Sequence, residues 1–346
     1  MRTRRAQSAY ILLIVALAAA CGGGNERAQL RVKPAYPLDD VLRLNHVQVI
    51  GTHNSYHRRP SVEIPGAWTD YAHPPLAEQL DAGVRSIELD VANVPQFPVQ
   101  HDPFVDDRSN CTPLATCLGE LEEWSDAHPG HLPIFVLIEA KDPSFLFDPV
   151  RDEWDLRAFD RLDTVIRSAM GPDNLVTPDD VRGDALTLRN AVVHRGWPRL
   201  EDVRGKFVFV LNRIALRRLY VVGHPSLEGR PMFVPAYENA PSAAFIEHDQ
   251  PSRSAIGDLV DKGFIVRTRA DADGREVEAE DYRRSRAAIE SGAQIVSTDY
   301  LVPDLSISEY QVVLPNDRPM RCNPLNAPTR CRSSDIENAR GLRRPH

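Results

Sequence analysis

The chain has 346 residues, of which 42% are hydrophobic, enough to form one large domain or two ordinary ones. Its formal net charge of -8 argues against a protein that binds the backbone of a nucleic acid, because such a protein needs a basic face. We therefore expect no nucleic-acid partner. An acidic chain can still approach a phosphate group through a bound cation.

Residues 1–20 have the pattern of an export signal. Three of the first five residues are arginines, residues 10–17 form an apolar stretch too short to span a bilayer, and three alanines precede Cys21. A cysteine there, followed by a tether over residues 21–44, resembles a bacterial lipoprotein lipidated at Cys21, although Leu17 stands one position further out than usual. We expect an exported protein, membrane-anchored in the outer membrane or at the cell surface, or otherwise secreted.

The other cysteines are an even set in a compartment that export makes oxidising. Three pairings are possible, and the short spacings favour Cys111–Cys117 and Cys322–Cys331. A zinc site would need tighter pairs and nearby histidines. We therefore expect two structural disulfides.

From residue 45 to about 302, apolar strand-like runs alternate with amphipathic segments. The strand-like runs are residues 47–50, 84–91, 98–101, 134–140, 207–212, 243–248, 264–270 and 294–300. The helical patterns are residues 76–80, 118–127, 156–170 and 280–292. Near-continuous apolar strands separated by helices indicate parallel pairing with both faces of the sheet covered.

Eight such strands over about 250 residues predict an α/β fold, a (β/α)8 TIM-type barrel. A doubly wound open sheet is the alternative, but no glycine-rich phosphate loop follows the first strand. We expect one catalytic barrel over residues 45–314 and an extended tail over residues 315–346, stapled by the last two cysteines.

Several of the predicted strands end in polar residues that share one face of the strand. These residues are His53–Asn54, Glu88 and Asp90, His101–Asp102, Glu139 and Lys141, Arg267 with Arg269 and Asp271, and Ser297 with Asp299. Residues i and i+2 of a strand point the same way, and buried charges need partners. We therefore expect these side chains to meet in one charged cavity at the carboxyl end of the barrel.

Four of these side chains offer oxygen atoms, and three of the four are carboxylates. Oxygen donors suit Ca2+ or Mg2+, and carboxylates packed without a cation raise one another's pKa. Ordinary surface salt bridges are the alternative, but two of the acids interrupt an apolar run. The four predicted metal ligands are Asn54, Glu88, Asp90 and Glu139.

Two histidines, His53 and His101, add groups that can move protons near neutral pH. A metal that polarises phosphoryl oxygens, combined with an acid–base pair, is a constellation for cleaving a phosphodiester.

Four short segments resemble the catalytic half of the phosphatidylinositol-specific phospholipases C, in particular the calcium-dependent bacterial branch. They are THNSYH (52–57), RSIELDV (85–91), VQHD (99–102) and FVLIEAK (135–141), and the resemblance continues through residues 201–212 and 291–300. It implies Ca2+ as cofactor, held by the four oxygen ligands, and His53 and His101 as the catalytic pair. The implied reaction is attack of the inositol 2-hydroxyl on its phosphate, giving diacylglycerol and inositol cyclic phosphate.

In that scheme His101 is the general acid and His53 stabilises the phosphorane, while the base is either His53 or a calcium-bound carboxylate. Arg267 resembles the arginine that grips the inositol. We expect substrate contacts from Lys141, Arg267, Arg269 and Tyr300.

Two departures from the eukaryotic relatives concern the inositol ring. Arg269 replaces an aromatic residue, and Leu211-Asn212-Arg213 replaces lysines that hold ring phosphates. Both changes favour plain phosphatidylinositol over polyphosphorylated lipids. The expected partner is a phosphatidylinositol-containing membrane, approached by a monomer through its anchor and apolar rim residues. The candidates for the rim are Trp68, Phe97, Phe104, Phe145 and Phe147.

Two other functions are alternatives. A glycerophosphodiester phosphodiesterase is also a metal-dependent barrel, but its first strand ends in His-Arg-Gly, and here that tripeptide occurs only in mid-chain, at residues 194–196. A non-catalytic surface lipoprotein that uses the barrel for binding would be expected to lose metal ligands, and this chain keeps the full set.

Overall fold

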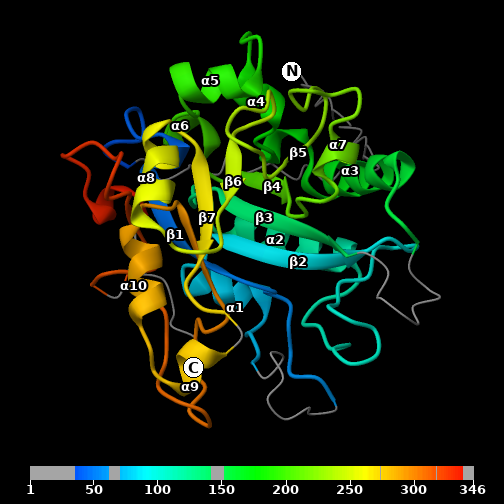
Figure 1. The fold of residues 1–346 in the computed structure, drawn as a ribbon. Coiled ribbons are helices and arrows are strands. Elements are labelled where there is room, and N and C mark those ends of the chain that lie inside the picture. Colours follow the sequence, from blue (N-terminus) through cyan, green and yellow to red (C-terminus); the bar gives the residue numbers. More distant parts are fainter. Residues whose placement is uncertain (1–35, 62–70, 142–151, 273, 317, 338–346) are drawn as a thin grey trace, which may run out of the picture. The chain divides into compact units, whose positions relative to one another are not determined.

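The computed structural model describes residues 36–337 except 62–70, 142–151, 273 and 317. These residues belong to one compact unit, in which parallel strands form the centre and helices cover the outside (Figure 1). The strands are β1 (Val47–Thr52), β2 (Ser86–Ala92), β3 (Ile134–Lys141), β4 (Phe207–Leu211), β5 (Met232–Phe233), β6 (Phe245–Glu247), β7 (Ile265–Arg269), β8 (Ile295–Thr298) and β9 (Met320–Cys322).

The first eight strands make a nearly closed parallel barrel. Their hydrogen-bonded order is β5-β4-β3-β2-β1-β8-β7-β6. Between β5 and β6 a single parallel bridge joins Pro235 to Phe245, and the Ala236 N–H donates to the Phe245 carbonyl at 3.1 Å. The predicted (β/α)8 barrel is therefore confirmed, and the carboxyl ends of its strands lie at one rim.

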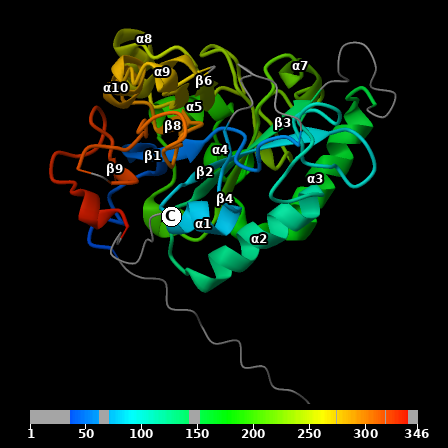
Figure 2. The same ribbon diagram turned by 90° about the horizontal axis from the view of Figure 1, so that it is seen from below.

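The helices connect successive strands on the outside of the barrel, as Figure 2 shows for α1, α2 and α3. The helices are α1 (Leu76–Asp81), α2 (Leu114–Ala127), α3 (Leu156–Met170), α4 (Pro178–Arg182), α5 (Leu188–His194), α6 (Leu200–Val203), α7 (Arg217–Tyr220), α8 (Arg253–Asp261), α9 (Arg275–Glu278) and α10 (Arg283–Glu290). Short 3-10 turns are η1 (Leu44–His46), η2 (Pro172–Asn174) and η3 (Ser333–Asp335). Among the described residues, no helix is both long and apolar enough to cross a membrane.

Helix α3 shows how the sequence determines these elements. The Asp155 carboxylate caps its first turn by accepting from the Ala158 N–H at 2.7 Å, and Phe159, Leu162 and Ile166 form the buried face at helical spacing. The helix ends at Gly171, whose φ of 71° favours glycine. The predicted boundaries of residues 156–170 agree with the structure.

One predicted strand, residues 98–101, is wrong. This segment runs antiparallel to β2 through a single bridge between Val91 and Val99, because a tight turn at residues 94–97, in which Gln96 and Phe97 have positive φ, reverses the chain. The missing barrel strand is β5, which has two residues and no detectable periodicity. The returning segment nevertheless carries His101 back toward the end of β2, where the Gln100 N–H donates to the Asp90 carbonyl at 3.1 Å.

Residues on both sides of the predicted barrel also pack against it. Leu42 and Leu44 are fully buried, although the sequence assigns them to a tether. In the predicted tail, β9 pairs antiparallel with β1, and the buried Glu337 carboxylate binds the Arg85 guanidinium under the barrel. The core thus extends beyond residues 45–314, because these apolar and charged side chains find partners on the barrel.

The two predicted disulfides, Cys111–Cys117 and Cys322–Cys331, are confirmed. The second closes a loop directly after β9 and so restrains the segment that covers β1. Cys21 and the signal-like segment lie outside the described residues, so export and lipidation stay predictions.

Candidate active site and metal centre

A tight turn after β1 presents His53 and Asn54 at the carboxyl rim. The turn is tied to β2, because the Ser55 N–H donates to the Glu88 carbonyl at 2.9 Å and the Glu88 N–H donates to Ser55 Oγ at 2.8 Å. Asn54 takes a left-handed backbone conformation with φ of 46°. Its Nδ2 donates to the Tyr71 hydroxyl at 3.0 Å, whereas its Oδ1 is buried and has no hydrogen-bond partner among the residues that the structure describes.

Three carboxylates meet beside this turn. Glu88 and Asp90 come from one face of β2, and Asp90 pairs in register with Glu139 of β3. One oxygen from each carboxylate lies within 4.8 Å of the other two. Together with the unpartnered oxygen of Asn54, these groups form a hard-oxygen donor set of the kind that Ca2+ takes. The residues present therefore fit a calcium ion.

Cationic side chains compensate the acids from two sides. Arg267 is buried and lies 2.9 Å from Glu88, 3.1 Å from Glu247 and 2.5 Å from Asp249. Burial disfavours its charge, but Glu88 and the other carboxylates outweigh this effect and raise its pKa. Arg267, expected to contact substrate, thus holds Glu88 in position at the same time.

Lys141 compensates the other two acids. Its Nζ lies 3.0 Å from Asp90 Oδ2 and 3.2 Å from Glu139 Oε1. Burial disfavours the ammonium form, but these two carboxylates raise the pKa of Lys141, so the side chain is charged. The backbone places it here because residues 139 and 141 point to the same side of β3.

His53 is held by a buried carboxylate. Its Nδ1 lies 2.7 Å from Asp299 Oδ1, and Arg269 Nη2 lies 2.7 Å from the other oxygen of Asp299. Burial and the charge of Arg269 oppose protonation of His53, but Asp299 and Glu88 outweigh them and raise its pKa. The Nε2 atom, 3.4 Å from Arg269 Nη1, is the ring nitrogen that Asp299 leaves for chemistry.

His101 faces a second buried carboxylate. Its Nδ1 lies 3.5 Å from Asp106 Oδ2, and the other oxygen of Asp106 binds His57 Nε2 at 2.9 Å. Burial and the nearby charge of Lys141 lower the pKa of His101 to about 3, although Asp106 opposes them. The two predicted catalytic histidines therefore differ in the direction of their pKa shifts.

Tyr300, the remaining predicted substrate contact, packs in an aromatic cluster. Its ring meets Tyr310 edge-on at 5.9 Å and lies 6.2 Å from Tyr71. It lines a cavity of about 380 Å³ that is also lined by Asp299, the partner of His53. Tyr300 is thus next to the site without joining the acidic cluster.

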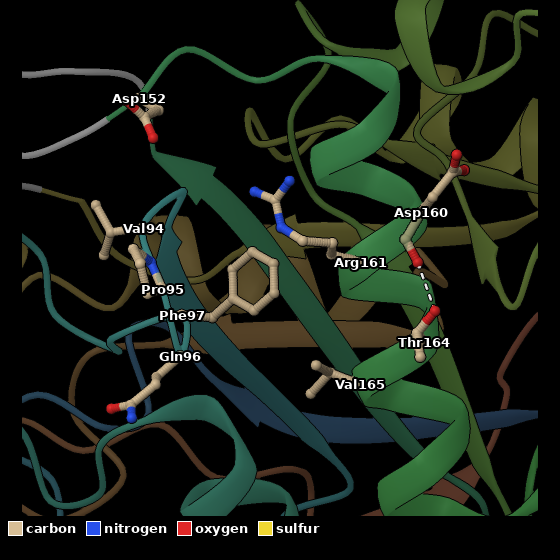
Figure 3. Close-up of a pocket in the computed structure, with 9 residues that line it drawn as sticks. All are labelled: Val94, Pro95, Gln96, Phe97, Asp152, Asp160, Arg161, Thr164 and Val165. Atoms are coloured by element: carbon tan, nitrogen blue, oxygen red, sulfur yellow. Dashed lines mark hydrogen bonds between the residues drawn. The ribbon is translucent and has the colours of Figure 1, made fainter.

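A polar cavity of about 290 Å³ opens over Glu88 and Glu139, two of the three clustered acids. Its lining includes His53, Glu88, Glu139, Arg267 and Arg269, together with Asn212, Arg213, Ile214, Ala215, Glu247 and Asp249. A larger cavity of about 790 Å³ lies between the loop after β2 and α3, where Arg161 extends toward the Phe97 ring (Figure 3). That cavity holds no residue of the carboxylate cluster, so its size does not make it the active site.

Three side chains that support the site have no role predicted from the sequence. Asn212 donates to Glu88 Oε1 at 3.2 Å, and Asp299 and Asp106 hold the two histidines. Asp299 stands at a polar strand end, which is a signal, but its partner cannot be read from one strand. Asp106 lies in a loop after residue 101, where no periodicity marks it.

The fold and the site together define a (β/α)8 barrel whose carboxyl rim carries an acidic cluster able to hold a metal ion. The sequence profile of the family described as "Phosphoinositide phospholipase C, Ca2+-dependent" matches residues 42–97 and 92–324. The chain belongs to this family of calcium-dependent enzymes, and the resemblance found in the sequence is confirmed.

Solved structures share the fold. A calcium-dependent phosphoinositol-specific phospholipase C from a Gram-negative Pseudomonas species matches with a TM-score of 0.58 and 18% identity, over 83% of this chain and 98% of that chain. A Ca2+-dependent phosphatidylinositol-specific phospholipase C from Streptomyces antibioticus matches with a TM-score of 0.53 and 21% identity, over 78% of this chain and 98% of that chain.

An uncharacterized protein in two strains of Mycobacterium tuberculosis is 28% identical over 158 residues, which are 42% of this chain and 31% of the relative. The match thus spans about a third of the length of these relatives.

Proposed function

We propose that this protein is a calcium-dependent phospholipase C that cleaves phosphatidylinositol. The observation that carries the proposal is the gathering of three carboxylates, with ligand atoms within 4.8 Å of one another, beside a histidine held by a buried aspartate. Family membership supports the phosphoinositide substrate class.

The proposed reaction is an intramolecular transfer of the phosphoryl group. The inositol 2-hydroxyl oxygen forms a bond to phosphorus, and the bond from phosphorus to the glycerol oxygen breaks. The 2-hydroxyl loses its proton to a base, and the glycerol oxygen receives one from an acid. The products are inositol cyclic phosphate and diacylglycerol, and no water or redox partner is consumed.

Asn54, Glu88, Asp90 and Glu139 would hold the calcium ion. Bound Ca2+ supplies positive charge that lowers the pKa of the attacking hydroxyl and stabilises the phosphoryl oxygens. Arg267 and Asn212 keep Glu88 oriented by contacts of 2.9 Å and 3.2 Å, so the carboxylate faces the cavity in a fixed position.

The two histidines suit opposite proton transfers. Asp299 accepts the Nδ1–H of His53, and the raised pKa makes His53 Nε2 the stronger base for the 2-hydroxyl proton. The lowered pKa makes protonated His101 the stronger acid toward the glycerol oxygen. The anionic phosphodiester of a bound substrate opposes the charge of Lys141 and favours the proton on His101.

Access to the lipid requires an apolar surface near the rim. Phe104, in the loop that carries His101, is 62% exposed, and Ile214, which lines the polar cavity, is 49% exposed. Both side chains lie in loops that directly follow barrel strands, on the carboxyl side where they could insert into a membrane surface. Phe97, also expected at the rim, is buried, and Trp68, Phe145 and Phe147 lie outside the described residues.

We also propose that the protein is exported and anchored through a lipid on Cys21. The support is the sequence pattern alone. Metabolic labelling with a radioactive fatty acid in a bacterial host should label the unmodified chain and leave Cys21→Ala unlabelled. Labelling of both proteins, or of neither, would contradict the anchor.

Product analysis tests the catalytic proposal. Vesicles of phosphatidylinositol should yield inositol cyclic phosphate with Ca2+ and none with EGTA, and soluble glycerophosphodiesters should be poor substrates. Faster turnover of glycerophosphodiesters would favour the rival phosphodiesterase. Vesicle binding without any product would support a non-catalytic binding lipoprotein.

A further inference from the structure

The ammonium group of Lys141 lies among the oxygen atoms proposed to bind calcium. Its Nζ is 3.0 Å from Asp90 Oδ2 and 3.2 Å from Glu139 Oε1. These two residues belong to the set of three carboxylates whose ligand atoms lie within 4.8 Å of one another. Lys141 therefore uses two members of the same cluster that a divalent cation would use.

The surrounding charges make this contact specific. Arg267 forms ion pairs with Glu88, Glu247 and Asp249. Arg213 lies 3.8 Å from Glu139. The ion pair of Asp90 is with Lys141, and the side chain of Lys141 is only 17% exposed. A partly buried ammonium at hydrogen-bond distance interacts far more strongly with a carboxylate than an exposed one does.

Lys141 adds a free-energy cost to calcium binding at these oxygens, beyond any cost that arises from the ligands themselves. Either the ammonium leaves Asp90 and Glu139, which breaks two ion pairs, or it stays and repels the ion at short range. Both routes weaken calcium binding. On strand β3 the ammonium cannot diffuse away, so its effective concentration at the site is high.

We infer that Lys141 is a built-in competitor of calcium, which keeps the acidic cluster neutralised without the ion and sets the calcium affinity of the site. The inference rests on the proposed function, because it takes the same carboxylates as calcium ligands. It gives Lys141 a role that differs from the substrate contact expected from the sequence.

Calorimetric titration of the full chain with Ca2+ tests this role. Lys141→Met should lower the dissociation constant for calcium at least tenfold, and Lys141→Arg, which keeps the charge, should not. The matched control is Lys262→Met, because Lys262 forms an exposed ion pair 2.7 Å from Glu238, away from the ligands. The control should bind calcium as the unmodified protein does.

An unchanged or weaker affinity in Lys141→Met would overturn the inference, because it would mean that the lysine orients the ligands. Should Lys141→Met fold only with calcium, Lys141→Gln, which also removes the charge, takes its place in the titration. A lower dissociation constant then supports competition, and an unchanged or higher one contradicts it.

The two proposals fail in different ways. If the unmodified protein binds no calcium, the metal assignment and the proposed function fail together. If it binds calcium and Lys141→Met binds no more tightly, only the competitor role fails.

Discussion

Replacing Asp299 by asparagine tests how the barrel prepares His53 for catalysis. The substitution keeps the shape of the side chain but removes the charge 2.7 Å from His53 Nδ1. A hydrogen bond to a charged group contributes about 1.5–3 kcal/mol. If that stabilisation is lost in the transition state, the rate falls about 10- to 150-fold.

The same change shifts the pH dependence in a defined direction. Asp299 raises the pKa of His53, so the variant should titrate His53 at a lower pH. Because His53 acts as base only when it is neutral, activity rises with pH through its pKa. The acidic limb of the kcat/KM profile should therefore move to lower pH in Asp299→Asn, measured with a soluble inositol phosphodiester.

Arg269→Met is the matched control, because Arg269 binds the same aspartate at 2.7 Å but lowers the pKa of His53. Its acidic limb should move to higher pH. Equal melting temperatures would show that both variants fold. An acidic limb that stays in place in Asp299→Asn, or moves upward, would refute the role of this carboxylate.

The remaining predictions concern the backbone, the second histidine and the rim. Gly51→Ala would bring a methyl group 2.7 Å from the Ser86 Cβ, so we expect a loss of about 1–3 kcal/mol in the free energy of unfolding, measured by urea denaturation. Asp106→Asn removes the carboxylate that raises the pKa of His101, so kcat should fall about tenfold, with little change in KM, and the basic limb of the pH profile should move to lower pH. Phe104→Ala should reduce binding to phosphatidylinositol vesicles in a sedimentation assay and leave turnover of a soluble substrate unchanged.

Each of these three has a clear contrary result. Unchanged stability of Gly51→Ala would mean that β1 and β2 do not need their close approach. A rise in KM alone for Asp106→Asn would point to substrate binding and not to proton transfer. Equal vesicle binding by Phe104→Ala and by the unmodified protein would remove that side chain from the membrane surface.

The sequence predicts those parts of the site that lie on regular strands. Periodicity locates β2 and β3, and the alternation of side chains puts Glu88 with Asp90 and Glu139 with Lys141 on shared faces. The sequence does not show which side chain each of the other site residues contacts. The contacts of Asp299 with His53 and of Asp106 with His101 depend on which strands are neighbours and on the path of a loop.

The same limit explains why two strands of the fold were predicted wrongly from the sequence. Residues 98–101 follow a turn and end in a polar pair as the other predicted strands do, yet their hydrogen bonds form with β2 in the opposite direction. Strand β5 has only two residues, too few to produce a pattern, and its position is set by the strand beside it. Both cases depend on interactions between distant residues, which local periodicity does not contain.

The metal assignment is tested most directly by a crystal structure of the protein in saturating calcium, with anomalous scattering used to locate the ion. We predict one calcium ion at the carboxyl rim, with the oxygens of Asn54, Glu88, Asp90 and Glu139 at about 2.3–2.6 Å. A calcium-saturated crystal with no ion at these four residues, or with the ion bound elsewhere on the barrel, would contradict it.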